Sequence, residues 1–124
     1  MLFLVLRAYL KLLLFDCYLL RGNFHALHNK VRRHLLRRWP LTQVGTNQVC
    51  AAADMACIWY WKEVLCLQRS AATACLLKEC GVMAEMVIGV QQLPFKSHAW
   101  VEVDGKVVSD KPYMRDMYAV IERC

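Results

Sequence analysis

Residues 94–110 read PFKSHAWVEVDGKVVSD, in which two alternating runs of side chains flank Asp104-Gly105. Alternation around an Asp-Gly pair is the strongest short-range signal of a β-hairpin. We predict that one face of this hairpin carries His98, Trp100, Glu102, Lys106, Val108 and Asp110. The opposite face is largely apolar and is expected to be buried; it carries Ala99, Val101, Val103, Val107 and Ser109.

The length of the hairpin loop decides whether the histidine and the acid share a face. A two-residue loop pairs Val103 with Lys106 and puts them on opposite faces. A three-residue loop, with Gly105 left-handed in a G1 bulge, pairs Glu102 with Lys106 and sets the histidine directly across from the acid. We therefore predict the bulged register.

A helix carrying a cysteine at its start is expected before the hairpin. Residues 66–78 place apolar side chains with a period near 3.6, and Gly81 follows as a stop signal. Cys66 lies in the first turn, where unpaired N–H groups and the helix dipole favour a thiolate. Cys75, nine residues on, points to the opposite side and is expected to be a buried packing thiol.

These patterns make Cys66, His98 and Asp110 the candidate catalytic residues. A cysteine that opens a helix, followed by a histidine and an acid on later strands, is how a thiol nucleophile is assembled. The plainer interpretation is a small buried cysteine and a packed histidine, each common when it occurs alone. Three residues that meet these conditions together favour catalysis.

Composition limits the classes of protein that fit. The chain has 124 residues, enough for one domain. Its seven cysteines are an odd number without regular spacing, which indicates a reducing, cytoplasmic compartment instead of a disulfide framework. Zinc-ligand spacing, a glycine-rich phosphate loop and an HExxH helix are all missing from the sequence. We expect neither a metal nor a nucleotide cofactor in the core chemistry.

Positive charge is concentrated in residues 1–44, which hold eight Lys or Arg residues against the single acid Asp16. Residues 24–39 are predicted to form a basic amphipathic helix ended by Pro40. Its basic face is either simply solvated, or a docking face for an acidic leader or partner, or a contact with nucleic acid or a membrane. No nucleic-acid motif supports the nucleic-acid alternative. The bases of this helix are Lys30, Arg32, Arg33, Arg37 and Arg38.

Residues 1–20 are apolar nearly all round, but Arg7, Lys11 and Asp16 interrupt them. A bilayer-spanning helix needs about 20 largely uncharged residues, so we predict a helix that does not span. A signal-peptide pattern is also missing. So apolar a helix must be covered by the protein's own core, by a partner subunit, or by the membrane interface.

The region between the basic helix and Cys66 contains a linker and one more helix. Residues 41–48 read as the linker, in which Gly45 and Thr46 break one helix and cap the next. Residues 49–64 are then expected to form a buried helix. Its Trp59-Tyr60-Trp61 run is either part of the core or the wall of a substrate groove. After the hairpin, Pro112 breaks the chain and residues 117–123 alternate as a last strand.

Three motifs carry a resemblance to a known family: CLQRS at 66–70, GVMAEMVIGV at 81–90, and the hairpin at 94–110. They resemble the transglutaminase-like leader peptidase of lasso-peptide biosynthesis, in its short stand-alone form. The resemblance covers about residues 46–124. It implies an α+β fold with a papain-like or transglutaminase-like core over residues 45–124, preceded by apolar and basic helices over residues 1–44, in one compact domain.

The resemblance also implies an activity. Cys66 would be the nucleophile, His98 the base and Asp110 the orienting acid, with Arg69 and Ser70 continuing the nucleophile motif. The expected reaction is removal of the leader from a ribosomally made lasso-peptide precursor in a bacterial cytoplasm, helped by a leader-recognition protein and an ATP-dependent lasso cyclase. The alternatives are a noncatalytic scaffold that holds the leader and an acyl transfer to an amine.

Overall fold

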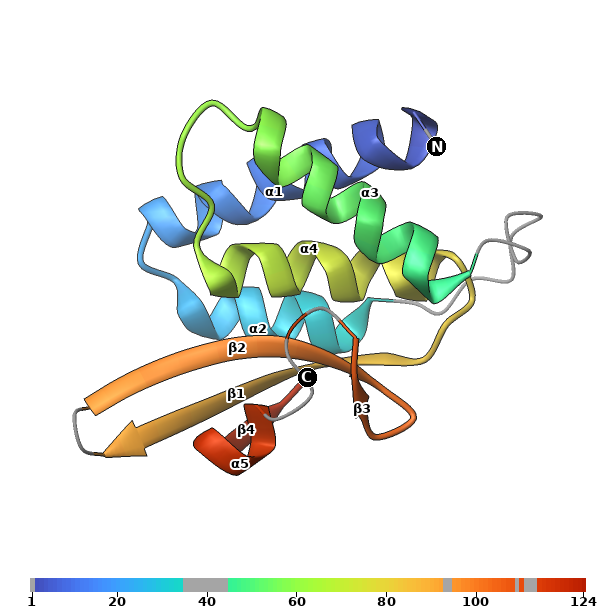
Figure 1. The fold of residues 1–124 in the computed structure, drawn as a ribbon. Coiled ribbons are helices and arrows are strands. Elements are labelled where there is room, and N and C mark those ends of the chain that lie inside the picture. Colours follow the sequence, from blue (N-terminus) through green and yellow to red (C-terminus); the bar gives the residue numbers. More distant parts are fainter. Residues whose placement is uncertain (1, 35–44, 93–94, 109, 111–113) are drawn as a thin grey trace.

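The fold is α+β, with helices stacked on one face of a four-stranded antiparallel sheet (Figure 1). This confirms the predicted fold class. The computed structural model describes residues 2–34, 45–92, 95–108, 110 and 114–124. The helices are α1 (Leu2–Leu20), α2 (Phe24–Arg33), α3 (Thr46–Trp59), α4 (Cys66–Glu79) and α5 (Met114–Met117). The strands are β1 (Ala84–Gln92), β2 (Phe95–Val103), β3 (Lys106–Val107) and β4 (Ala119–Arg123).

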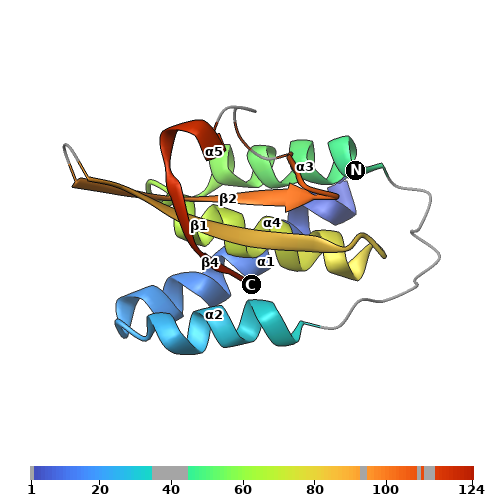
Figure 2. The ribbon, with the colours of Figure 1, turned by 90° about the horizontal axis from the view of Figure 1, so that it is seen from below.

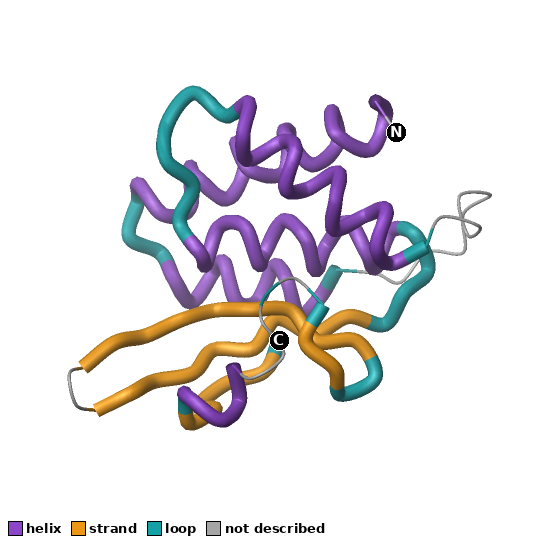
Figure 3. Tube along the Cα trace, in the orientation of Figure 1, coloured by secondary structure: helices purple, strands orange, loops and turns teal. Residues whose placement is uncertain are grey.

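Helix α4 lies at the centre of the molecule, between the sheet and the helices α1 and α3 (Figure 3). Every residue from Ser70 to Glu79 is buried, because α1, α2, α3 and the sheet pack around the helix. The predicted start at Cys66 is confirmed, and Cys75 is buried as expected. The most important helix of the core therefore also carries the candidate nucleophile.

The end of α4 is closed by a Schellman motif at Gly81. Gly81 has a φ of 83°, which an L side chain rarely adopts. Its N–H donates to the carbonyl of Lys78 at 3.1 Å, and the N–H of Val82 donates to that of Leu77 at 2.9 Å. This cap reverses the chain so that β1 runs back along the helix that precedes it.

Helix α1 packs one face against α3 and α4 and leaves the other face exposed. Leu4, Ala8, Leu12 and Phe15 are buried in the shared core. The protein's own core therefore covers α1 only in part, since Leu2, Phe3, Leu6, Leu10 and Leu20 stay exposed. Among the described residues, no helix has the length and apolar character needed to cross a bilayer.

Helix α2 is shorter than the sequence predicts. It ends at Arg33, and His34 is extended with a φ of −64° and a ψ of 124°. One physical reason is that His34 turns its ring to Glu79, with Nε2 at 2.6 Å from Oε2. The apolar stripe of α2 does pack on the core, through the buried Leu27 and Val31. Predictions on residues 35–44, including Arg37, Arg38 and the stop at Pro40, lie outside the described residues.

Helix α3 begins at Thr46, three residues before the predicted start at Val49, and Gly45 is its N-cap. It ends at Trp59, before the predicted end at Val64. The core interpretation of the aromatic run is right for Tyr60, which is buried, and wrong for Trp59 and Trp61, which are exposed. The two tryptophans lie at the end of α3 and do not line the hollows described for the candidate site below.

The sheet has the strand order β3-β2-β1-β4, and each neighbouring pair is antiparallel (Figure 2). Strands β1 and β2 pair along their full length, from Ala84 opposite Val103 to Gln92 opposite Phe95. The predicted last strand is present as β4, which pairs with β1. The predicted break at Pro112 falls outside the described residues.

The bulged register predicted for the β2–β3 hairpin is wrong. Val103 pairs with Lys106 across a two-residue turn, in which Asp104 has a φ of 53° and Gly105 a φ of 75°. Positive φ at both positions is typical of a type I′ turn, and aspartate tolerates the left-handed conformation better than most residues. The two-residue turn is therefore available without a bulge.

The hairpin face that carries His98 is also more buried than predicted. Trp100 and Glu102 are almost fully buried, because Met114 and Tyr118 from the α5–β4 segment cover this face. Trp100 Nε1 donates a hydrogen bond to Glu102 Oε2 at 2.8 Å. The sheet thus has the main helical core on one face and a smaller aromatic cluster on the other.

Candidate active site

Cys66 is exposed at the first residue of α4. The preceding Leu65 is extended, with a φ of −75° and a ψ of 152°, and serves as the N-cap without a side-chain hydrogen bond. The first N–H groups of a helix have no acceptor within the helix, so they surround the thiol with donors. The sequence prediction of a cysteine at a helix start is confirmed in position.

A buried polar network holds the chain that leads into Cys66. Tyr60 OH donates to Asp16 Oδ2 at 2.8 Å, and Lys62 Nζ lies 2.7 Å from Asp16 Oδ1. Gln68 in the first turn of α4 donates to the carbonyl of Leu12 at 2.7 Å. Burial opposes ionisation of Asp16, but the bonds from Lys62 and Tyr60 outweigh it and keep its pKa below the usual value. The chain segments before and after Cys66 are therefore both hydrogen-bonded to α1.

His98 on β2 is paired with Asp110, whose Oδ2 lies 2.5 Å from His98 Nε2. The side chains are 26% and 22% exposed, so reactants can reach them. Because a carboxylate only accepts hydrogen bonds, Nε2 carries a proton, and Nδ1 is the ring nitrogen left for another partner. Asp110 reaches the histidine because β3 ends at Val107, so the face alternation of a strand no longer applies to it.

The structure brings all three predicted site residues together. Cys66, His98 and Asp110 line one small hollow of about 20 Å³, with Ala99 and the motif residues Arg69 and Ser70. Arg69 donates to Asp54 of α3 at 2.6 Å, which ties this wall to the neighbouring helix. The hollow is of the size that holds one water molecule.

Two aromatic rings that the sequence does not mark as site residues orient the imidazole. His98 stacks on Tyr118 with ring centroids 5.6 Å apart, and on Trp100 at 6.2 Å, both at an interplanar angle of 27°. Trp100, two residues from His98, was recognisable as a neighbour on the same face of the strand. No local pattern indicates Tyr118, because it reaches the site through the fold-back of β4 onto β1.

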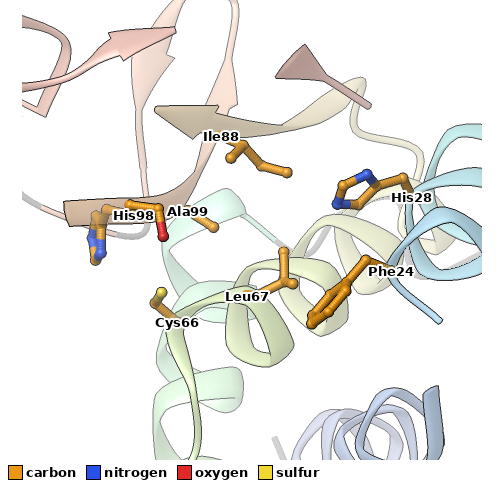
Figure 4. Close-up of a pocket in the computed structure, with 8 residues that line it drawn as sticks. Phe24, His28, Cys66, Leu67, Ile88, His98 and Ala99 are labelled. Carbon is orange, nitrogen blue, oxygen red and sulfur yellow. The ribbon is translucent and has the colours of Figure 1, made fainter. Parts of the chain in front are cut away.

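A larger hollow of about 240 Å³ opens beside the same thiol (Figure 4). Leu67 of α4 and Ile88 of β1 form its apolar sides, and Phe24 and His28 of α2 close the end away from Cys66. His28 Nδ1 lies 3.0 Å from Glu122 Oε2 on β4. Helix α2 of the N-terminal segment therefore forms part of the wall of a hollow beside Cys66.

The remaining cysteines differ from Cys66 in their surroundings. Burial raises the pKa of Cys50 and of Cys75 to about 11. Burial also raises the pKa of Cys57, Cys80 and Cys124. These thiols stay protonated near neutral pH and are poor nucleophiles. The exposed cysteines are Cys66 and Cys17, and Cys17 lies on α1 away from both hollows.

One group of potential metal ligands occurs among the described residues. His28, Glu122 and Cys124 place their ligand atoms within 4.8 Å of one another. Arg32 Nη2 already lies 3.1 Å from Glu122 Oε1, and its positive charge opposes a cation there. We assign no metal to this group.

A thiol at the start of a buried helix and a histidine on the adjoining sheet, paired with an acid beyond the end of the last hairpin strand, are the arrangement of a papain-like or transglutaminase-like protein. The family model described as "Transglutaminase-like superfamily" matches residues 10–123, and the chain belongs to this family. No solved structure matches the chain significantly.

A curated relative supports the resemblance noted in the motifs. Over 56 residues the chain is 48% identical to the microcin J25-processing protein McjB of Escherichia coli. The match covers 45% of this chain and 27% of the relative, so it spans about a quarter of that protein's length. The transglutaminase-like family predicted from the motifs is confirmed.

Proposed function

We propose that this protein is a cysteine peptidase that removes the leader peptide from a lasso-peptide precursor. The observation that carries the proposal is the shared hollow of Cys66, His98 and Asp110, with the 2.5 Å contact between the histidine and the acid. Membership of the transglutaminase-like family and the identity with a microcin-processing protein support the substrate class. No cofactor is needed for the steps below.

The proposed reaction follows from the roles of these side chains. His98 Nδ1 takes the proton of Cys66, whose sulfur attacks the carbonyl carbon at the leader–core junction. As the C–N bond breaks, the imidazolium gives its proton to the departing amine of the core peptide. Asp110 keeps Nε2 protonated and stabilises the charged ring. Water then adds to the thioester, which releases the leader as a carboxylic acid and restores the thiol.

The oxyanion of each tetrahedral intermediate needs hydrogen-bond donors. The backbone N–H of Cys66 is our candidate, because the first N–H groups of α4 have no intrahelical acceptor and the helix dipole favours negative charge there. This donor belongs to the main chain. Replacement of the Cys66 side chain should therefore remove the nucleophilic sulfur and keep the oxyanion donor.

The proposed partners are the precursor's leader region, a leader-recognition protein that delivers it, and an ATP-dependent cyclase that uses the freed amine. Their setting is the bacterial cytoplasm. The exposed apolar face of α1 suits contact with one of these proteins or with a membrane surface. An assay of leader cleavage with and without ATP tests whether ATP changes the cleavage rate.

The decisive measurement is mass spectrometry of a lasso-peptide precursor incubated with this protein, with and without the leader-recognition protein and ATP. We expect free leader and free core, and we expect Cys66→Ala to abolish both. Cys75→Ala and Cys80→Ala are the matched controls and should retain most of the cleavage, because these thiols are buried packing groups.

Two other outcomes would favour the rival functions. Full cleavage by folded Cys66→Ala would exclude the thiol mechanism and favour a leader-binding scaffold that works with another enzyme. Addition of a small primary amine separates hydrolysis from acyl transfer, because aminolysis of the thioester gives a leader amide in place of the acid. A dominant amide product at low amine concentration would show that the protein is an acyl transferase.

A further inference from the structure

Two hollows of different chemistry flank the Cys66–His98 pair. The small one has polar walls from Arg69, Ser70 and Asp110. The larger one, of about 240 Å³, has mostly apolar walls and runs from the thiol along the first turn of α4 (Figure 4). A polar wall suits water or an amine, whereas an apolar wall suits a hydrocarbon side chain.

The size of the apolar hollow fits a large peptide side chain and is small for a drug-sized ligand. Pockets for drug-sized ligands have about 300–1,000 Å³, and this hollow of about 240 Å³ is smaller. Leu67 and Ile88 form the two sides, and Phe24 lies across the outer end. His28 is held there by Glu122, so it forms a fixed end wall.

We propose that this hollow is a specificity pocket for a large aliphatic side chain on the acyl side of the cleaved bond, with Phe24 of α2 as its outer wall. The inference rests on the proposed function, because it names the acyl part of that substrate. The acyl side is assigned to the apolar hollow because the polar hollow beside Asp110, which has room for one water molecule, suits the incoming water.

Phe24 is the wall residue best suited to a test. It is 52% exposed, so its truncation removes pocket surface with little effect on the core. Phe3 on α1 is a matched control, because it is also a phenylalanine, is 55% exposed and does not line the hollow. Phe24→Leu keeps an apolar wall and serves as the conservative variant.

The experiment measures alkylation of Cys66 by three acetylated dipeptide chloromethyl ketones, Gly-Gly, Leu-Gly and Gly-Leu. In each reaction the sulfur of Cys66 displaces chloride from the reagent and forms a C–S bond. The reagent takes the place of the substrate, so the assay needs no precursor peptide. Site-resolved mass spectrometry gives the rate at Cys66 and, as an internal reference, at the exposed Cys17. Iodoacetamide reports the reactivity of each thiol without a side chain to bind.

We expect either the Leu-Gly or the Gly-Leu reagent to alkylate Cys66 about tenfold faster than the Gly-Gly reagent. A rate ratio of this size is expected for partial burial of one aliphatic side chain. The same ratio at Cys17 should be about one. Phe24→Ala should reduce the selectivity at Cys66 to about threefold or less, while Phe24→Leu and Phe3→Ala keep most of it. Iodoacetamide rates should not change in any variant.

Equal rates for all three reagents at Cys66 of the unaltered protein would overturn the pocket. Undiminished selectivity in Phe24→Ala would overturn the assignment of Phe24 as its wall. Failure of the proposed function looks different, because an intact precursor together with leucine-selective alkylation would leave the pocket in place and remove only leader cleavage.

Discussion

The orientation of one ring decides whether the candidate site can work. Asp110 contacts one nitrogen of His98, and Tyr118 and Trp100 stack on the ring. A histidine held on its edge and on its faces has one accessible nitrogen to offer a thiol. The carboxylate and the aromatic rings restrict different motions, so their loss should have different effects.

Replacement of the acid should affect rate and leave the fold intact. We expect Asp110→Asn to lower leader cleavage by orders of magnitude, because an amide no longer selects the tautomer or stabilises the charged imidazole. The measurement is the single-turnover cleavage rate, with circular dichroism to check folding. Asp104→Asn is the matched control, since asparagine also tolerates the left-handed turn. A normal rate in Asp110→Asn would remove the acid from the mechanism.

Gly89 permits the close approach of the rings behind the histidine. A Cβ at this position would lie 2.7 Å from Trp100 Cη2 and 2.7 Å from Tyr118 Cβ. We therefore expect Gly89→Ala to lower the free energy of unfolding by about 1–3 kcal/mol, the usual cost of overpacking. Urea unfolding measures this. Gly45→Ala, where a Cβ meets open space, should change stability far less, and equal effects would contradict the packing argument.

The candidate residues could be named from the sequence because their signals are local. Cys66 stands where a helical pattern begins, and His98 lies in an alternating strand. Phe24, His28 and Tyr118 could not be named, because α2 and β4 approach the site only through tertiary packing. Short-range patterns report which element a residue belongs to and do not report which distant elements meet.

At the scale of elements, His98 and Asp110 of the hairpin region meet as predicted, although the predicted bulged register is wrong. The predicted bulge sets His98 across from Asp110, whereas the turn in the structure has two residues. Asp110 reaches the ring from beyond the end of β3, where the chain has left the sheet. The alternation of side chains predicts the face of a residue only within the paired part of a strand. The sequence does not show at which residue the β2–β3 pairing ends.

Helix α4 is anchored at its far end by a buried acid. Glu79 contacts Arg7 and Lys11 of α1, and it accepts a hydrogen bond from His34 at 2.6 Å. Burial opposes ionisation of Glu79, but Lys11, His34 and Arg7 outweigh it and hold its pKa below the usual value. Burial lowers the pKa of His34, so its ring is a neutral donor near pH 7.

This cluster predicts a pH dependence of stability. A carboxyl whose pKa is lowered by folding stabilises the fold above its unfolded pKa of about 4.3, and this stabilisation is lost as the pH falls through the folded value. Glu79→Gln should therefore cost about 3 kcal/mol at pH 7 and flatten the acid limb of the stability curve. Urea unfolding between pH 3 and pH 7 measures both. The exposed Glu63→Gln should change neither, and an unchanged acid limb in Glu79→Gln would contradict the assignment.

At the scale of the whole molecule, one surface is unusually apolar. Leu6 of α1 is 56% exposed and Trp59 of α3 is 72% exposed, and both line a hollow of about 440 Å³ together with Val5, Tyr9 and Met55. Exposed apolar surface that forms a hollow can bind an apolar ligand or a partner protein. The sequence left open what covers α1, and its own core covers one face only.

We expect this surface to bind a hydrophobic dye in the native state. The double variant Leu6→Gln, Trp59→Gln should lower dye fluorescence severalfold, with little change in thermal stability, because both side chains are largely solvated already. Leu20→Gln, an exposed leucine at the other end of α1, is the control and should have a smaller effect. Absence of dye binding by the unaltered protein would show that the patch is too small or too polar.

The central position of α4 has a consequence for how the protein loses function. Its amide hydrogens from Ser70 to Glu79 belong to the most enclosed helix, so they should exchange with solvent only when the whole chain opens. Cys66 begins that same helix, so its position depends on the packing of the core. Heat inactivation should therefore follow global unfolding, and conditions that slow the exchange of these amides should lengthen the working lifetime of the protein by the same factor.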